Sequence, residues 1–478
     1  MKSDLFIDLH CHSTLKPYSR SFKEAAHTGQ NTADITEEHS VWYMDHEVLT
    51  DKISNVLLSV TRFTQADFKT SYHGGVKVIM VSIDPMEKAL VYSKKGNRQI
   101  FTGQWLKNFI IGIGRPRIKN LFELTDYYKD LYATYDYLKQ LDGQFVQLGD
   151  QKVRYKLVDR YADIDVNDKQ TLYVVMTIEG GHVFNTGLQL ANVITDVNQV
   201  LNNIKDLKSD RWAVKPFFVA IAHHFPNQLC GHARSFKGIS TLAYDQKADK
   251  KQGITTLGLA VIKRLLQNDG GQKRIYIDVK HMNPRSRFAY YNLLNSEAYR
   301  QEGIPIIVSH GALKFMKKPD RFTDDINFYN EEIVYIAKSQ GIFGVQMDER
   351  RLLKRKPKMK KRDQKQRPKR LLYRKAYYVW RQIEAMALLL YKDPAFNGDC
   401  WGIQAIGSDF DGIIDPLNGY WTHNHLSDLA HYLRLHAYNF LYTETGLALP
   451  DRHLLNAETI IEKFCFGNAQ RFLAAYLK

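Results

Sequence analysis

The chain contains 478 residues, of which 44% are hydrophobic and 25% charged, a balance that is typical of a folded globular protein and excludes a disordered chain. This length accommodates one large barrel or two to three ordinary domains. The formal net charge of +16 is concentrated in the segment 350–375, which contains fifteen lysines and arginines and a single aspartate. The rest of the chain is therefore nearly neutral.

The first apolar run, FIDLHCH (6–12), ends in two histidines, His10 and His12. Side chains two positions apart on a strand lie on the same face, so these imidazoles project together while Cys11 points away. Two neutral imidazoles at this spacing can hold one metal ion. Taken alone, the pair is explained equally well by two partly exposed histidines at the end of a strand.

Seven further short apolar runs follow along the chain, and most are separated by stretches that can form a helix, such as 257–268 and 330–339. These runs are VKVIMVSID (76–84), LYVVMTIEGG (172–181), FFVAIAHH (217–224), RIYIDVKH (274–281), IPIIVSH (304–310), GIFGVQMD (341–348) and GIQAIGSDFDG (402–412). Eight nearly continuous apolar strands that alternate with helices predict a parallel sheet, and their number favours closure into a (β/α)8 barrel of the TIM type with long inserted loops.

Six of the eight runs carry residues of metal-ligand type at their C-terminal ends. These residues are His10 and His12, Glu179, His223 and His224, His281, His310, and Asp409 and Asp411. In a barrel these ends meet at one mouth, where such barrels build their active sites. Any one of them is readily explained as a cap or a satisfied polar group, but six together indicate a common site.

Histidines and carboxylates at one mouth suit zinc or a similar divalent ion and exceed what one tetrahedral ion needs. The number of ligands predicts two ions that share a bridging carboxylate and generate a hydroxide between them near neutral pH. With a carboxylate that takes and returns a proton, the predicted chemistry is hydrolysis of an amide, an ester or a related bond.

The motif series closely resembles that of the membrane (renal) dipeptidase family, a binuclear zinc branch of the amidohydrolase superfamily with a (β/α)8 fold. The motifs that carry the resemblance are, in order, IEGGH (178–182), IDVKH (277–281), PIIVSH (305–310) and IGSDFDG (406–412). Weaker matches are HGGV (73–76), AHHFPN (222–227) and FGNAQR (466–471). The resemblance spans nearly the whole chain, so we expect one hydrolase domain over 1–478 with the basic segment 350–375 inserted between the seventh and eighth strands.

The resemblance implies a role for each matching residue. Glu179 would bridge the two ions, His10 and His12 would bind one of them with Asp409 close by, and His281 and His310 would bind the other. Asp409 would also take the proton of the attacking hydroxide and pass it to the leaving amine. His223 would contact the substrate and stabilise the tetrahedral oxyanion. Arg321, eleven residues after His310, would bind the C-terminal carboxylate of the substrate.

Several of these assignments have a rival. His224 is adjacent to His223, and only one of the two can face the mouth. Asp411 is better explained as a turn residue or a supporting partner than as the base. We interpret His182 as shaping the turn after Glu179. For Arg321 the rival explanation is a surface arginine in a charged loop.

The chain departs from the family at its first strand. Typical members carry HxD there, whereas this chain carries HxH with His12 in the place of the aspartate. A neutral ligand in place of an anionic one raises the net charge of the site and affects its metal preference.

The sequence therefore predicts a dipeptidase-like metallopeptidase that cleaves a dipeptide or a similar small amide. The alternative within the same chemistry is a hydrolase of a lactone, an N-acyl amino acid or a cyclic amide. A hypothesis from a different functional class is a binding protein without catalytic activity. Its barrel would serve as a scaffold, and the segment 350–375 would bind an anionic partner such as nucleic acid or a lipid surface. The prolines of that segment and its lack of apolar periodicity favour a solvated loop instead. A homodimer is compatible with each of these functions.

The sequence also indicates a compartment. Four scattered cysteines without CxxC spacing (Cys11, Cys230, Cys400 and Cys465) argue against a disulfide framework and fit a reducing environment. No stretch approaches the roughly 18 consecutive apolar residues of a membrane-spanning helix. Residues 1–4 leave no room for a signal peptide before the first run, so we expect a cytoplasmic protein.

Overall fold

The computed structural model describes residues 5–45, 61–90, 112–187, 195–235, 252–268, 273–317, 325–352 and 368–478. Eight parallel strands form a closed barrel whose order around the ring follows the chain, since β2 pairs with β5 and β10 pairs back to β1. The barrel strands are β1 (Phe6–Cys11), β2 (Val76–Ile83), β5 (Thr171–Glu179), β6 (Phe218–Ala220), β7 (Tyr276–Asp278), β8 (Ile307–Gly311), β9 (Ile342–Val345) and β10 (Gln404–Ile406).

Each barrel strand lies within one of the eight predicted apolar runs or extends beyond it by one residue, and every residue of these strands is buried. Burial on both faces explains why the runs are nearly continuous in hydrophobicity. The predicted (β/α)8 barrel is confirmed.

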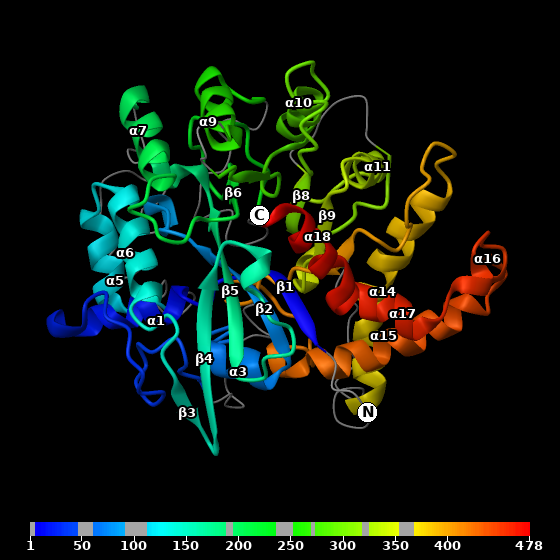
Figure 1. Ribbon diagram of the computed structural model, residues 1–478, viewed down its shortest axis with the longest axis horizontal. Helices are drawn as coiled ribbons and strands as arrows, with labels where there is room; N and C mark the ends of the chain where they lie inside the picture. Colours follow the sequence, from blue (N-terminus) through cyan, green and yellow to red (C-terminus); the bar gives the residue numbers. More distant parts are fainter. Residues whose placement is uncertain are drawn as a thin grey trace.

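Helices lie around the strands in Figure 1, and the two stretches predicted as helical, 257–268 and 330–339, do form helices. The helices of three or more turns are α6 (Tyr127–Lys139), α7 (Val197–Leu207), α9 (Thr256–Leu266), α10 (Pro284–Leu294), α14 (Pro368–Tyr391) and α15 (Leu426–Leu441). The shorter ones are α1 (Leu15–Arg20), α3 (Phe68–His73), α5 (Arg115–Glu123), α11 (Asn330–Lys338), α12 (Glu349–Leu352), α16 (Glu444–Leu447), α17 (Ala457–Glu462) and α18 (Asn468–Tyr476).

The four cysteines all lie within the described ranges, where they are buried and form no disulfide bond. Buried thiols of this kind act as small apolar side chains. Within the described ranges, no helix combines the length and the apolar character that a membrane crossing needs.

A hairpin of β3 (Val146–Leu148) and β4 (Gln151–Val158) precedes β5 and is absent from the sequence-based prediction. Its strands are antiparallel, and β4 also pairs in parallel with the N-terminal half of β5. In Figure 1 the hairpin extends beyond the barrel strands. It lies at the end of the strands away from the predicted site, because it joins β5 at the start of that strand.

The interpretation of 350–375 as a solvated loop is wrong at both of its ends. Arg350 and Arg351 lie in α12, and residues 368–375 form the first turns of α14. Arg350 makes an ion pair with Asp348 at 2.7 Å, and buried Lys375 pairs with Glu349. Residues 353–367 lie outside the described ranges. At its described ends, basic side chains are therefore used for internal ion pairs.

A fully buried ion pair joins α10 to α11. Arg287 donates from Nε and Nη2 to the two carboxylate oxygens of Glu332, at 2.7 and 2.8 Å. Tyr291 Oη and the backbone N of Tyr329 donate to the same carboxylate, at 2.9 Å each. We expect Glu332→Ala to lower the free energy of unfolding by about 3–5 kcal/mol, because it leaves a buried guanidinium without its partner.

Urea unfolding followed by circular dichroism measures this loss. Asp163→Asn serves as the control, because it breaks the surface pair between Asp163 and Arg160 and should change the free energy of unfolding by less than about 1 kcal/mol. Equal stability losses in the two variants would contradict the expected importance of the buried pair.

Candidate metal centre

Predicted ligands from five strands meet at the C-terminal mouth of the barrel. His10 lies at the end of β1, Glu179 ends β5, His281 follows β7, His310 lies in β8, and Asp409 follows β10. All five side chains are buried, as is that of His12. The parallel strands bring these residues together from positions up to 399 apart in the chain.

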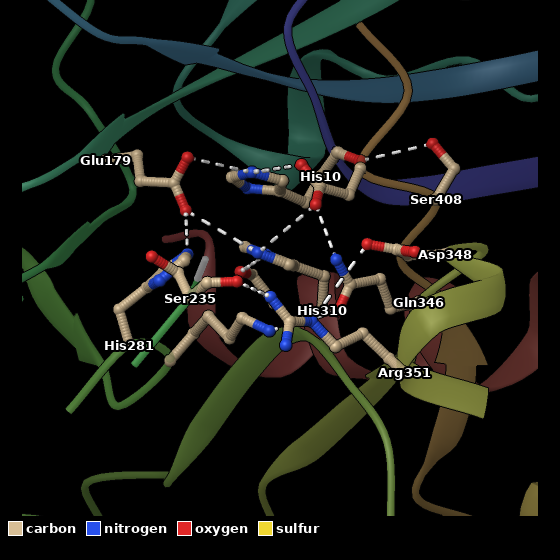
Figure 2. Close-up of polar contacts among 12 residues, drawn as sticks. His10, Glu179, Ser235, His281, His310, Gln346, Asp348, Arg351 and Ser408 are labelled. Atoms are coloured by element: carbon tan, nitrogen blue, oxygen red, sulfur yellow. Dashed lines mark hydrogen bonds and ion pairs between the residues drawn. The ribbon is translucent and has the colours of Figure 1, made fainter. Parts of the chain in front are cut away.

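The two carboxylate oxygens of Glu179 face two separate pairs of imidazoles. Oε2 lies 3.4 Å from Nε2 of His10 and 3.0 Å from Nε2 of His12. Oε1 lies 2.9 Å from Nε2 of His281 and 3.5 Å from Nε2 of His310. Figure 2 shows His10, His281 and His310 turned toward this carboxylate. Glu179 therefore has the position that a bridging ligand requires.

The carboxylate of Asp409 also approaches the imidazoles of His10 and His12. Its Oδ1 is 3.8 Å from Nε2 of His10 and 3.6 Å from Nε2 of His12. Gln346 Nε2 donates to its Oδ2 at 2.6 Å and fixes the carboxylate in the mouth. The backbone of Asp409 has φ +60° and that of His281 has φ +64°, a region that costs a non-glycine residue about 1–3 kcal/mol. The fold thus holds two of the predicted site residues in strained conformations.

His223, and not its neighbour His224, reaches Glu179. Nε2 of His223 lies 3.5 Å from Oε2 of Glu179, and its Nδ1 lies 3.1 Å from Oε2 of Glu87. His224 instead makes a hydrogen bond of 2.8 Å through Nδ1 to Ser235 Oγ. Glu87 also accepts the backbone N–H groups of His224 and Phe225, which fixes it beside His223. The geometry thus separates the two adjacent histidines.

The buried charges of the site shift its pKa values. Burial alone would lower the pKa of His223, but the carboxylates of Glu179 and Glu87 raise it to about 10. Burial would raise the pKa of Glu179, but the surrounding imidazoles hold it well below its usual range. Burial lowers the pKa of His281 and of His310 well below the usual value. Burial would lower the pKa of His12, but Asp409 and Glu179 raise it well above the usual value. At neutral pH the site therefore combines carboxylates, the imidazolium forms of His12 and His223, and the neutral imidazoles of His281 and His310. The neutral form is the one that binds metal, so metal binding at His12 releases a proton.

The donor set fits divalent metal ions. Nε2 of His10 and Nε2 of His12 lie only 3.1 Å apart and can share a single proton, while Nε2 of His310 and Oε1 of Glu179, which face each other, have no hydrogen-bond partner within the described part of the chain. Interior polar atoms without partners are uncommon and call for an explanation such as an ion. Ligand atoms that lie within 4.8 Å of one another occur in His10, Glu179 and His310, and in His10, His12 and Asp409. Imidazole and carboxylate without thiolate suit zinc.

A second layer of hydrogen bonds holds the first strand against the loop after β10. Asp8 accepts the backbone N of His10 at 3.2 Å and that of Ser408 at 2.9 Å. His423 contacts the same carboxylate through Nε2 at 2.8 Å, and Ser408 Oγ donates to it. This layer fixes His10 relative to Asp409, because Ser408 and Asp409 are adjacent.

Two charged residues beside the group are missing from the sequence-based candidates. Lys280 Nζ donates to Gln346 Oε1 at 3.1 Å, so a chain of hydrogen bonds runs from Lys280 through Gln346 to Asp409. Burial lowers the pKa of Lys280 to about 7. Arg351 sends its guanidinium toward the same group, and its Nη2 donates to the carbonyl of Ser235 at 2.5 Å (Figure 2).

The guanidinium of Arg351 is only partly used by the protein. Its Nε lies 4.0 Å from Oδ2 of Asp348, a carboxylate that Arg350 already contacts through Nε and Nη2. Among the described residues, Nε and Nη1 of Arg351 have no hydrogen-bond partner. Burial lowers its pKa to about 10, so the group stays charged at neutral pH.

Asp84 is a third residue that the candidates omit, although a signal for it exists in the sequence. It is the last residue of the second apolar run, 76–84, and so lies at the C-terminal end of its run, as Glu179 and His281 do. Burial raises the pKa of its carboxyl to about 7. Asp84 lines a cavity of about 30 Å³ together with His12, Glu179, His223, His281 and Asp409. This volume is of the order of one or two water molecules.

The remaining residues considered from the sequence are Asp411, His182 and Arg321, and none of them is seen among the predicted metal ligands. Asp411 accepts the backbone N–H groups of Gln65 and Ala66 and makes an ion pair with Lys16 at 2.6 Å. Its carboxylate is thus used to hold the loop before α3. His182 makes a hydrogen bond of 2.6 Å through Nε2 to the carbonyl of Pro85. Arg321 lies outside the described residues.

The solved structures of similar fold include two metallopeptidases. One is a metallopeptidase described as dipeptidase AC of family M19; it is 13% identical, the match covers 100% of this chain and 99% of that one, and the TM-score is 0.54. The other is a metallopeptidase from Rhodobacter sphaeroides liganded with a phosphinate mimic of the dipeptide L-Ala-D-Ala; it is 13% identical, the match covers 99% of this chain and 100% of that one, and the TM-score is 0.54. No protein-family model and no curated protein sequence matches the chain. At this identity the likeness establishes a shared fold.

Proposed function

We propose that the protein is a binuclear zinc hydrolase that cleaves a dipeptide or a similar small amide. The observation that carries this proposal is the placement of the Glu179 carboxylate between two imidazole pairs at the mouth of the barrel. Support comes from the two metallopeptidases of the same fold, one of which is described with a bound dipeptide mimic. The motif resemblance points to the same activity. We further propose that 1–478 acts as one hydrolase domain in the cytoplasm.

The ligands would divide between two ions as the geometry around Glu179 divides them. His10 and His12 would hold one ion with Oε2 of Glu179, and His281 and His310 the other with Oε1. When bound, two zinc ions supply Lewis-acid polarisation of a carbonyl and a nucleophile at neutral pH. The buried position of all these ligands excludes bulk water and strengthens the electrostatic interactions.

Two residues would carry out the proton and charge steps. Asp409 would accept a proton at Oδ1 and return it to the nitrogen of the leaving amine, because Gln346 occupies only Oδ2. His223 would donate a hydrogen bond from Nε2 to the developing oxyanion, and Glu87 holds it in the charged form for this task.

The C-terminal carboxylate of the substrate would bind an arginine. The resemblance assigns this task to Arg321, and Arg351 offers a second guanidinium with unused nitrogen donors. A planar guanidinium recognises a carboxylate through two parallel hydrogen bonds.

Metal analysis and a substrate panel test the function. We expect the purified protein to carry close to two zinc ions per chain and to hydrolyse dipeptides, including ones with a D-residue at the C-terminal position, in preference to lactones, cyclic amides and N-acyl amino acids. Absence of stoichiometric metal after metal-replete purification would contradict the proposal. Preference for a lactone, a cyclic amide or an N-acyl amino acid would keep the metal chemistry and change the substrate.

The arginine assignment needs its own variants. We expect Arg321→Ala to raise KM by about 10–100-fold for dipeptides with a free carboxylate and to leave C-terminally amidated dipeptides nearly unaffected, since only the former lose a charged hydrogen-bond pair. Arg351→Gln is measured on the same pairs of substrates. If only Arg351→Gln shows the carboxylate-dependent loss, the assignment to Arg321 is wrong.

A further inference from the structure

A carboxylate that no motif assigns stands at the mouth beside the predicted metal ligands. Asp84 directly follows β2, and its side chain is 9% exposed. Its Oδ1 has no hydrogen-bond partner in the part of the chain that the structure describes. The side chain lines the same cavity as His12 and Glu179. Asp84 is therefore an acid that lines the cavity of the site and has one oxygen without a hydrogen bond.

The ligand atoms of Asp84, His12 and Glu179 all lie within 4.8 Å of one another. Two buried carboxylates at such a separation repel each other unless a cation lies between them or one takes up a proton. The nearest imidazoles do not supply that cation by hydrogen bonding. His182 Nε2 is 3.8 Å from Asp84 Oδ1 and bonds to Pro85, and the two ring nitrogens of His223 face Glu87 and Glu179.

The first strand supplies only neutral ligands, so a further carboxylate near His12 would balance the charge of a bound ion. His10 and His12 are both neutral as ligands, whereas the HxD pattern of the resembling family brings one negative charge to the same place. β1 is adjacent and parallel to β2 on one side and to β10 on the other, so the end of β2, like the end of β10 that carries Asp409, can bring a carboxylate to His12.

We propose that Asp84 is a ligand of the ion held by His10 and His12, and that it supplies from the second strand the negative charge that the first strand lacks. This inference rests on the proposed metal centre and adds one residue to it. The ion would then have two imidazoles and the carboxylates of Asp84 and Glu179 around it, with Asp409 beside them. Four donors of this kind form a complete set for zinc.

Zinc binding of three variants tests the inference. Asp84→Asn keeps the shape of the side chain and removes its charge, and we expect it to weaken one of the two zinc ions by about 10–100-fold in a competition titration with a chelator. The double variant His12→Asp, Asp84→Asn moves the charge to the first strand and should restore zinc affinity to within about threefold of wild type. Glu87→Gln is the matched control, because Glu87 is a buried carboxylate beside His223 and is no ligand in this assignment; both ions should remain.

The outcomes separate this inference from the proposed function. If wild type binds two zinc ions and Asp84→Asn titrates identically, Asp84 is no ligand, and the proposed function is unaffected. A double variant that binds zinc no better than Asp84→Asn also overturns the inference. If wild type binds no zinc, the proposed function fails and the inference fails with it.

Wild-type crystals grown with zinc provide a test that does not depend on the folding of a variant. Anomalous scattering locates each ion, and we expect one ion about 2.0–2.2 Å from an oxygen of Asp84. An ion held by His10 and His12 with the carboxylate of Asp84 outside bonding distance would overturn the inference.

Discussion

Replacing Glu179 by glutamine is expected to remove both metal ions and to lower kcat/KM by on the order of 10⁴-fold or more. The two oxygens of this carboxylate face different imidazole pairs, at 2.9–3.5 Å. An amide has one acceptor oxygen and one donor nitrogen, so it can serve one pair and opposes an ion at the other. The variant also removes the negative charge that balances two cations in a buried site.

Metal content and thermal unfolding measure this effect without reference to turnover. Chelation should lower the melting temperature of the wild type and leave that of Glu179→Gln unchanged, because bound metal stabilises the folded state by mass action. Glu302→Gln is the control, since Glu302 pairs with Arg274 before the start of β7, at the opposite end of the strands. A Glu179→Gln protein that retains two ions per chain would show that another group bridges them.

The barrel itself could be predicted from the sequence because its information is local. Each buried parallel strand is a short apolar run, and the polar residue that ends a run lies at the mouth whatever the details of the fold. His281 and His310 illustrate this rule: each terminates a run, and both reach Glu179 in the structure. The hairpin β3–β4 also has a local signal, since polar and apolar residues alternate over 152–157 and a glycine, Gly149, precedes them. It lies, however, in a region that matches no family motif.

The supporting contacts could not be predicted, because they depend on how distant segments pack. The contact of His423 with Asp8 joins residues 415 positions apart, and that of Gln346 with Asp409 joins residues 63 apart. Neither residue carries a pattern of its own. The position of His223 rather than His224 in the site likewise depends on its contact with Glu87. No sequence pattern indicates that Glu87 packs against the end of β6.

The departure at His12 shows where a resemblance to a family can mislead. A motif comparison treats the first strand by itself and finds one negative charge missing. In the folded chain, the end of β2 lies beside the end of β1 and carries Asp84. A site is tuned by the sum of its charges, so a substitution on one strand is understood only together with the adjacent strands.

Asp409→Asn is expected to keep most of the bound metal and to lower kcat by about 10²–10⁴-fold, which is the usual contribution of a general acid or base. Asparagine has the same shape, and its oxygen can still accept the hydrogen bond that Gln346 Nε2 donates. The amide cannot take up a proton, so transfer to the leaving amine is lost. Zinc analysis together with kcat at saturating substrate distinguishes this loss from a loss of metal.

Asp411→Asn, two positions further on, is the informative comparison, because Asp409 is proposed to transfer a proton whereas Asp411 forms a structural ion pair. Asp411 is bound by Lys16 at 2.6 Å and by two backbone N–H groups, so its variant should lose about 3–5 kcal/mol of stability through a buried, unpaired lysine. Its folded fraction should retain kcat. If Asp411→Asn lost turnover at full stability while Asp409→Asn remained active, the proton step would belong to Asp411, and Asp409 would be left with a purely structural role.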